Sequence, residues 1–284
     1  MNKKHLTIVP FGVSAVRGAQ ASALLAVLAW GSPTYAQEEE GFIAPGTETF
    51  KIGLGGVFNE ADTTLRLDSS SGRSGEVDLE DVAGLERNMS SVFLLANWRF
   101  APNHRIGLQA FQVKRDATKT TSRDIQLRDS VIPAGTQLEL ETESRFVVVN
   151  YQYSFIHNDR LELAGIGGLY GARFKFSFNA SSPPTDIDAS TNAPLPMLGL
   201  SMDWFITPRW TVSALAEGLA VKVGDIEGRT YNVVLATDYM LTRHIGVGLG
   251  VGWVDLSLDV SKNEFKGHVD WGMKSFFAYL QGRF

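Results

Sequence analysis

The sequence contains no cysteine in its 284 residues. This absence excludes disulfide bonds, thiolate catalysis and cysteine-based metal sites, and it suits a chain that crosses an oxidising compartment. The chain also lacks a basic surplus, since its formal net charge is -5, which argues against a nucleic-acid partner. Beyond the N-terminal segment, no apolar run approaches the roughly 20 residues that a transmembrane helix needs.

The bulk averages leave one class of membrane protein open. Hydrophobic residues make up 44% of the chain and the mean hydropathy is -0.03, values that a water-soluble protein would also show. The strands of a transmembrane barrel alternate lipid-facing apolar residues with lumen-facing polar residues, so the two faces cancel in any average. Composition therefore does not distinguish a water-soluble protein from a transmembrane barrel. The order of the residues along the chain must be used to distinguish them.

Residues 1–36 have the pattern of a secretory signal peptide. Lys3, Lys4 and Arg17 supply positive charge before the apolar run at 22–30, and the segment ends in Thr-Tyr-Ala. We expect cleavage after Ala36, which would leave residues 37–46 as a flexible periplasmic lead-in. The pattern predicts export through the inner membrane of a Gram-negative cell.

From residue 47 onward, apolar and polar residues alternate with a period of two, which indicates β-strands. About ten such segments follow one another up to residue 284, and eight or twelve remain open, depending on how residues 76–86 are assigned. The fourth and fifth segments slip register midway, which predicts bulges. The sequence predicts an all-β fold, a transmembrane antiparallel up-and-down β-barrel.

The connections between these segments differ in length on the two sides of the predicted barrel. Short turns are expected at 101–104, 157–159, 207–208 and 242–243, and long polar loops at 69–88, 119–135 and 180–193. Short periplasmic turns with longer external loops are typical of outer-membrane barrels. An even number of strands would place both ends of the barrel on the short-turn side.

Aromatic residues provide a second test of the barrel prediction. Trp and Tyr prefer the two membrane–water interfaces, and a soluble β-sandwich would instead bury them in its core. Here they gather at both ends of the predicted strands. The predicted interface aromatics are Trp98, Trp204, Trp210, Tyr239, Trp253 and Trp271.

The last residues of the chain carry a family resemblance. Counting back from Phe284, apolar Leu280, Ala278 and Phe276 occupy alternate positions. This resembles the terminal-Phe signal by which the barrel assembly machinery recognises outer-membrane barrels, although Gly282 replaces the aromatic residue often found there. With the alternation, the chain from residue 47 to 284 is similar to the small OmpA- and OmpW-type barrels. The resemblance implies an assembly signal at Phe276, Leu280 and Phe284, and names no activity.

The non-apolar faces of the strands would line the barrel interior. Buried charges persist only when paired, so they would form a neutralising network that plugs a narrow lumen, or else line a narrow polar pore. A row of four glycines at 246–252 could make room for long side chains or for water. The predicted lumen-lining charges are Lys51, Arg99, Glu162, Asp203, Glu217, Asp238 and Arg283.

Catalytic and metal-binding candidates are few. His268 shares a strand face with Asp270, and such a carboxylate could orient a general base, but no serine motif or carboxylate pair accompanies them. The acidic loop containing Asp78, Glu80 and Asp81 lacks the spacing of a calcium loop and is expected to be solvated. We therefore predict no catalytic residue, metal or cofactor.

The sequence favours a non-enzymatic outer-membrane barrel, either structural or a narrow channel for small solutes. A loop-mediated adhesin or receptor is the alternative, and an outer-leaflet hydrolase is a third class. The expected partners are outer-membrane lipids and lipopolysaccharide, the barrel assembly machinery and periplasmic chaperones.

Overall fold

The computed structural model describes residues 7–8, 41–68, 74–78, 80–81, 84, 86–122, 124–127, 130–181, 184–223, 226–262 and 265–284. The predicted signal peptide and the first part of the lead-in lie outside these residues, except for positions 7–8. The described part of the chain contains no helix long and apolar enough to span a bilayer.

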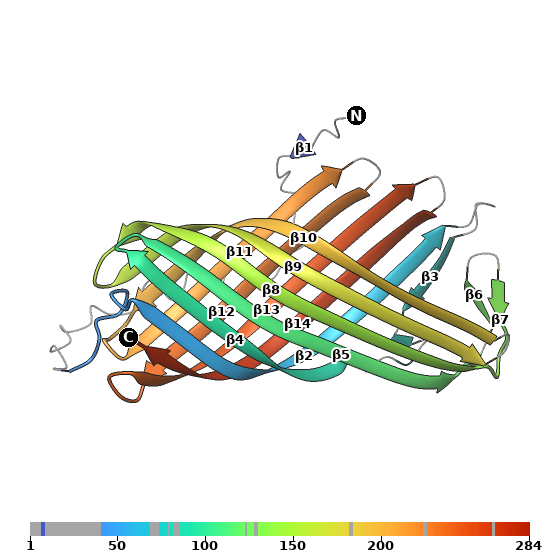
Figure 1. Cartoon of the computed structure of the whole chain (residues 1–284), viewed down its shortest axis with the longest axis horizontal. Coiled ribbons are helices and arrows are strands. Elements are labelled where there is room, and N and C mark those ends of the chain that lie inside the picture. The colour runs from blue at the N-terminus through green and yellow to red at the C-terminus, as the bar shows by residue number, and fades with distance from the viewer. Residues whose placement is uncertain are drawn as a thin grey trace, which may run out of the picture.

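Ten antiparallel strands of the described chain form a closed barrel, as the sequence predicts (Figure 1). Each strand pairs with the next around the ring, and the last pairs with the first, so the ring has no free edge. The ring strands are β2 (Phe50–Asp68), β4 (Asn88–Ala101), β5 (His104–Thr120), β8 (Gln137–His157), β9 (Leu161–Ser181), β10 (Pro184–Phe205), β11 (Trp210–Val223), β12 (Ile226–Met240), β13 (Ile245–Lys262) and β14 (Phe265–Arg283).

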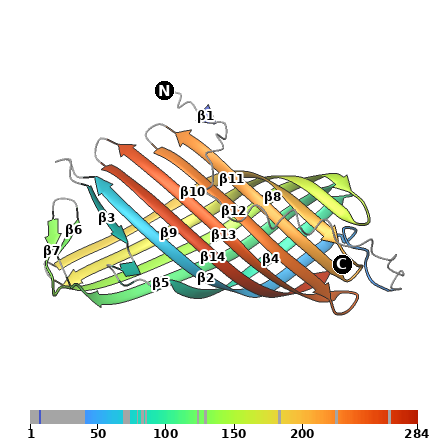
Figure 2. The same cartoon turned by 180° about the vertical axis from the view of Figure 1, so that it is seen from behind.

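The barrel closes where the two ends of its chain meet. Strand β14 runs antiparallel to β2, with Arg283 opposite Lys51 and Phe276 opposite Phe58. The backbone N–H of Phe284 donates to the carbonyl of Phe50 at 2.9 Å, and the N–H of Phe50 donates back to the carbonyl of Phe284. The C-terminus thus lies at the end of the barrel that carries the short turns (Figures 1 and 2).

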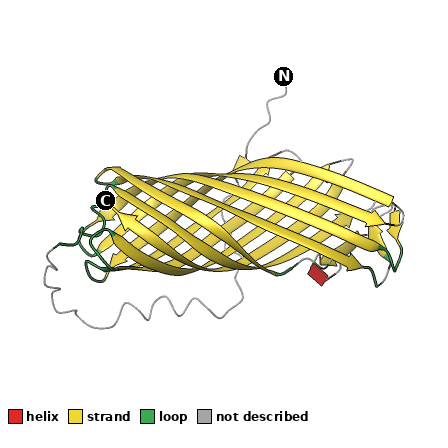
Figure 3. Ribbon diagram, turned by 60° about the horizontal axis from the view of Figure 1, so that its bottom comes forward, coloured by secondary structure: helices red, strands yellow, loops and turns green. Residues whose placement is uncertain are grey.

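The loop side contains more strand than the sequence predicts. The expected loop at 180–193 is wrong, because β9 and β10 continue as one hairpin with Ser181 opposite Pro184. Part of the expected loop at 119–135 forms a small hairpin of β6 (Ile125–Leu127) and β7 (Ser130–Ile132). The ends of β9 and β10 lie near this hairpin (Figures 1 and 2), and strands make up most of the described chain in the ribbon view (Figure 3).

Two further short strands attach to the ring without joining it. Strand β3 (Ser74–Asp78) pairs with the loop-side end of β2, so the segment at 76–86 adds no ring strand and the count of ten holds. Strand β1 (Thr7–Ile8) pairs with β11. The expected mid-strand slips reduce to one bulge between Ser154 and Ile156, close to the turn that joins β8 and β9.

Candidate functional site in the barrel lumen

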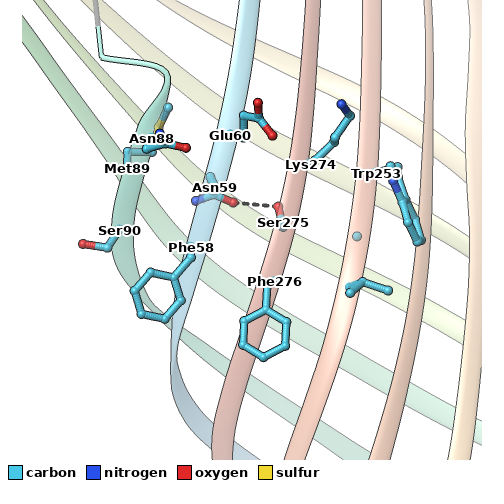
Figure 4. Close-up of a pocket in the computed structure, with 12 residues that line it drawn as sticks. Phe58, Asn59, Glu60, Asn88, Met89, Ser90, Trp253, Lys274, Ser275 and Phe276 are labelled. Atoms are coloured by element: carbon cyan, nitrogen blue, oxygen red, sulfur yellow. Dashed lines mark hydrogen bonds between the residues drawn. The ribbon is translucent and has the colours of Figure 1, made fainter.

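The outer face of the barrel carries an apolar band that begins at the short turns. Leu198 and Leu200 on β10 are 64% and 60% exposed, as lipid-facing residues would be. On β2 and β14 the band ends at Phe58 and Phe276, which charged residues follow on the same face. Around a shallow hollow of about 640 Å³ in the outer wall, Phe58 and Phe276 point toward the turn side, whereas Glu60 and Lys274 point toward the loop side (Figure 4).

Most of the predicted interface aromatics lie on this outer face. Large exposed side chains occur at Trp98, Trp210 and Tyr239 beside the turns and at Trp253 at the opposite limit of the band. Trp204 shares the outer face of β10 with the exposed leucines. The three residues of the predicted assembly signal are also exposed there, at Phe276, Leu280 and Phe284.

Trp271 departs from the interface prediction. Its side chain lines a cavity inside the barrel together with Met273 and Phe277, which occupy the same face of β14. Counting back from Phe284 in steps of two never reaches position 271, so the alternation itself contained this information. Position along the strand alone therefore predicts the wrong face for Trp271.

The first ionic cluster of the lumen surrounds Asp238 on β12. Its carboxylate accepts a hydrogen bond from the Lys51 ammonium at 2.6 Å and lies 3.5 Å from the Arg283 guanidinium. The Tyr279 hydroxyl donates to the other oxygen at 2.5 Å. Asp238 and Arg283 are almost completely buried, so each charge depends on these partners to offset its desolvation.

The second ionic cluster surrounds Glu162 on β9. Arg99 binds the two carboxylate oxygens with two guanidinium nitrogens at 3.1 and 2.8 Å, the bidentate geometry that gives the strongest pairing. Ser154 also donates to this carboxylate. Arg105 lies 3.6 Å from Glu162 and 3.1 Å from Asp203, and so links the two acids.

These two clusters form a layer across the lumen beside the short turns. Four cations, Lys51, Arg99, Arg105 and Arg283, face the acids Glu162, Asp203 and Asp238, and Glu48, just before β2, lies close enough to act on Arg105. A polar cavity of about 170 Å³ remains between them. The sequence prediction missed Arg105, although its place on the inner face of β5 opposite Arg99 and Gln152 could have revealed it.

The glycine row of β13 makes room for aromatic side chains from β14. An ideal Cβ atom built on Gly248 would lie 2.1 Å from Cζ of Tyr279, and one on Gly250 would lie 2.3 Å from Cζ of Phe277. Both rings therefore lie over the inner face of β13, in the space that side chains on β13 would otherwise occupy. They pack edge-to-face against Phe93 with centroids 5.8 Å apart.

On the loop side of the ionic layer, the side chains that line the lumen are mainly apolar. A cavity of about 290 Å³ is lined by aromatic and aliphatic side chains from most of the ring strands. Glu217 on β11 reaches this cavity instead of the ionic layer, and is the one predicted lumen charge for which the described residues provide no ion pair. Its carboxylate accepts hydrogen bonds from Tyr170 and, at 3.3 Å, from Asn232.

Part of the expected acidic loop packs against β2 and β5 on the loop side of the barrel. Glu80 is buried, pairs with Arg115 of β5 and accepts a hydrogen bond from the backbone N–H of Thr63 at 2.9 Å. Asp78 and Asp81 pair with Arg87 at 3.4 and 3.0 Å. The expectation of a solvated acidic loop is therefore wrong for Glu80, whereas the side chain of Asp81 is 74% exposed and that of Asp78 is 39% exposed. The described part of the chain holds no cluster able to bind a metal ion.

His268 lies on the outer surface beyond the apolar band. Its Nδ1 and Nε2 atoms contact Asp259 and Asp270, both at 2.7 Å. Hydrogen bonding to Asp259, and then to Asp270, raises the pKa of His268 above its ordinary value although partial burial opposes it. With both ring nitrogens held by carboxylates, this imidazole has no free lone pair with which to accept a proton from a substrate.

Comparisons with known proteins show which solved structures share this fold. No family model and no curated protein sequence matches the chain. Among solved structures, the outer membrane protease OmpT from Escherichia coli matches with a TM-score of 0.54 and 12% identity, over 86% of this chain and 99% of OmpT. The Pseudomonas putida toluene transporter TodX (TM-score 0.38, 9% identity, 86% and 93% covered) and Ail of Yersinia pestis (0.34, 12%, 81% and 98%) also match. The chain has the fold of the outer-membrane β-barrels.

Proposed function

We propose that the chain is a non-enzymatic integral outer-membrane barrel whose lumen is closed toward the periplasm. The observation that supports this proposal is the layer of paired, buried charges beside the short turns. Four cations and the acids Glu162, Asp203 and Asp238 bond one another across the ring, so little polar surface is left for a permeating ion. Side chains that fill the interior in this way are typical of small barrels.

The absence of catalytic geometry in the described residues supports the non-enzymatic assignment. The His268 imidazole is held between two carboxylates on the outer wall, away from the lumen and without a nucleophile among its hydrogen-bond partners. The activity of OmpT belongs to that protein, because a likeness at 12% identity concerns the fold alone.

Conductance in a planar bilayer tests the closed lumen. The refolded chain should run as a heat-modifiable, folded band and show no discrete conductance steps, because the ionic layer blocks the path. Discrete steps whose ion preference shifts in Asp203→Asn or Arg99→Gln would establish the polar pore instead. Arg145→Gln, which changes a charge on the outer wall, is the matched control and should alter nothing in either case. If the barrel is folded and shows no conductance, partners are expected to bind at the loop-side ends of β8, β9 and β10.

A further inference from the structure

We propose that the apolar cavity of the lumen is a binding site for a small organic ammonium compound, with Glu217 as its anionic partner. The site goes beyond a closed structural barrel, since it lies on the loop side of the ionic layer, which it adjoins at Tyr279. It rests on one buried carboxylate and on the walls that surround it.

Glu217 has a buried oxygen atom without a partner. The side chain is 5% exposed, and its Oε2 atom accepts the hydrogen bonds from Tyr170 and Asn232. Its Oε1 atom is buried and has no hydrogen-bond partner in the described part of the chain. Among the described residues that line the apolar cavity, no other side chain has a buried polar atom in this state.

An unpaired carboxylate oxygen is costly in such surroundings. Burying a charge away from water is unfavourable unless a cation or several donors offset its desolvation. Elsewhere in the lumen, arginine and lysine supply that compensation, as they do for Glu162 and Asp238. The described chain offers no such cation to Glu217, so a cationic ligand would supply the missing contact and keep the carboxylate ionised.

The walls of the cavity select an organic cation over a metal ion. They are mainly apolar and include the rings of Phe93, Phe111, Phe146, Trp271 and Phe277. Aromatic faces attract ammonium groups and also pack against apolar bodies, whereas a hard metal ion requires six or more oxygen ligands. A single carboxylate among aromatic rings therefore matches an ammonium group attached to an apolar body.

The size of the cavity limits the ligand. Its volume of about 290 Å³ is roughly twice that of the engineered cavity of ~150 Å³ that admits benzene in another protein. One aromatic ring with a short ammonium-bearing chain is of this size. A neutral ligand of the same shape would fill the space but leave Oε1 unpaired, so the cavity should discriminate by charge.

Calorimetric titration of 2-phenylethylamine into the purified full chain in detergent tests the proposal. Wild-type chain should bind one equivalent, and Glu217→Gln should weaken binding by at least about tenfold, because the charge-assisted contact is lost. Glu143→Gln, an acid removed from the outer wall, is the matched control and should bind like wild type. The partition of the amine into micelles is common to all samples and is subtracted.

Two further measurements keep the test decisive if Glu217→Gln fails to fold. Gly252 lines the cavity, and a Cβ atom there would meet nothing closer than 3.7 Å, so Gly252→Val should fold and weaken binding by reducing the space. The neutral analogue 2-phenylethanol should bind wild-type chain at least about tenfold more weakly than the amine. No binding by wild type, equal binding by Glu217→Gln, or equal affinity for the two probes would overturn the proposal.

Discussion

Adding one methyl group at Gly248 should destabilise the barrel, whereas the same change four residues further along the same strand should not. The Cβ atom of Gly248→Ala would lie 2.1 Å from Cζ of Tyr279 and 2.5 Å from two further ring atoms. The ring cannot easily move away, because its hydroxyl bonds to Asp238 at 2.5 Å and its edge packs against Phe93. Overpacking of this kind costs about 1–3 kcal/mol.

Gly252→Ala is the matched control for that prediction. It also faces the lumen from β13, but its Cβ atom would meet Ser275 at an ordinary 3.7 Å. Replacing a strand glycine by alanine without strain gains about 0.5–1 kcal/mol through the lower entropy of the unfolded chain. The free energies of unfolding of the two variants should therefore differ by about 1.5–4 kcal/mol.

Urea titration of the barrel in detergent micelles, followed by tryptophan fluorescence, measures both variants. In a Tyr279→Leu background the ring is gone, and Gly248→Ala should then cost much less than in the wild-type background. Equal stabilities for the two alanine variants, or the same cost in both backgrounds, would show that the glycine row does not accommodate the aromatic rings as described.

Two further predictions concern charged groups. Glu162→Gln should lower the free energy of unfolding, measured in urea, by about 3–5 kcal/mol, because it leaves Arg99 buried without its counter-charge. An unchanged unfolding midpoint would mean that the ionic network is not essential for stability. His268 has a raised pKa in the folded chain, so its contribution to stability is complete below the unfolded pKa of about 6.5 and is lost as the pH rises through the folded pKa. Unfolding midpoints should fall as the pH rises from about 6 to about 9, more in wild type than in His268→Gln, and identical pH profiles would contradict the assigned contacts with Asp259 and Asp270.

The alternation of apolar and polar residues predicts which face of the barrel wall a side chain occupies better than its position along the strand does. All seven lumen charges were predicted from this alternation, and the structure places them on the inner side of the wall. Trp271 was assigned from its position along the strand, and it faces inward. Neither the alternation nor the position along the chain predicts the strands at 180–193. A strand pair beyond the apolar band can be polar on both faces, and its sequence then shows no period of two.

The sequence by itself determined the class of the fold and the face on which most side chains lie, and it predicted about ten strands without excluding eight or twelve. These follow from a local property, since successive residues of any strand point to opposite sides. Only the tertiary structure decided which charges meet, because closing the ring brings Lys51 to Asp238 across 187 positions of the chain. It also decided that the acids of the ionic layer have cations within reach and that Glu217, deeper in the lumen, has none among the residues that the structure describes. Ion pairing of this kind depends on how deep a side chain lies in the lumen and on which residues face it from other strands. Neither can be deduced from the sequence of a single strand.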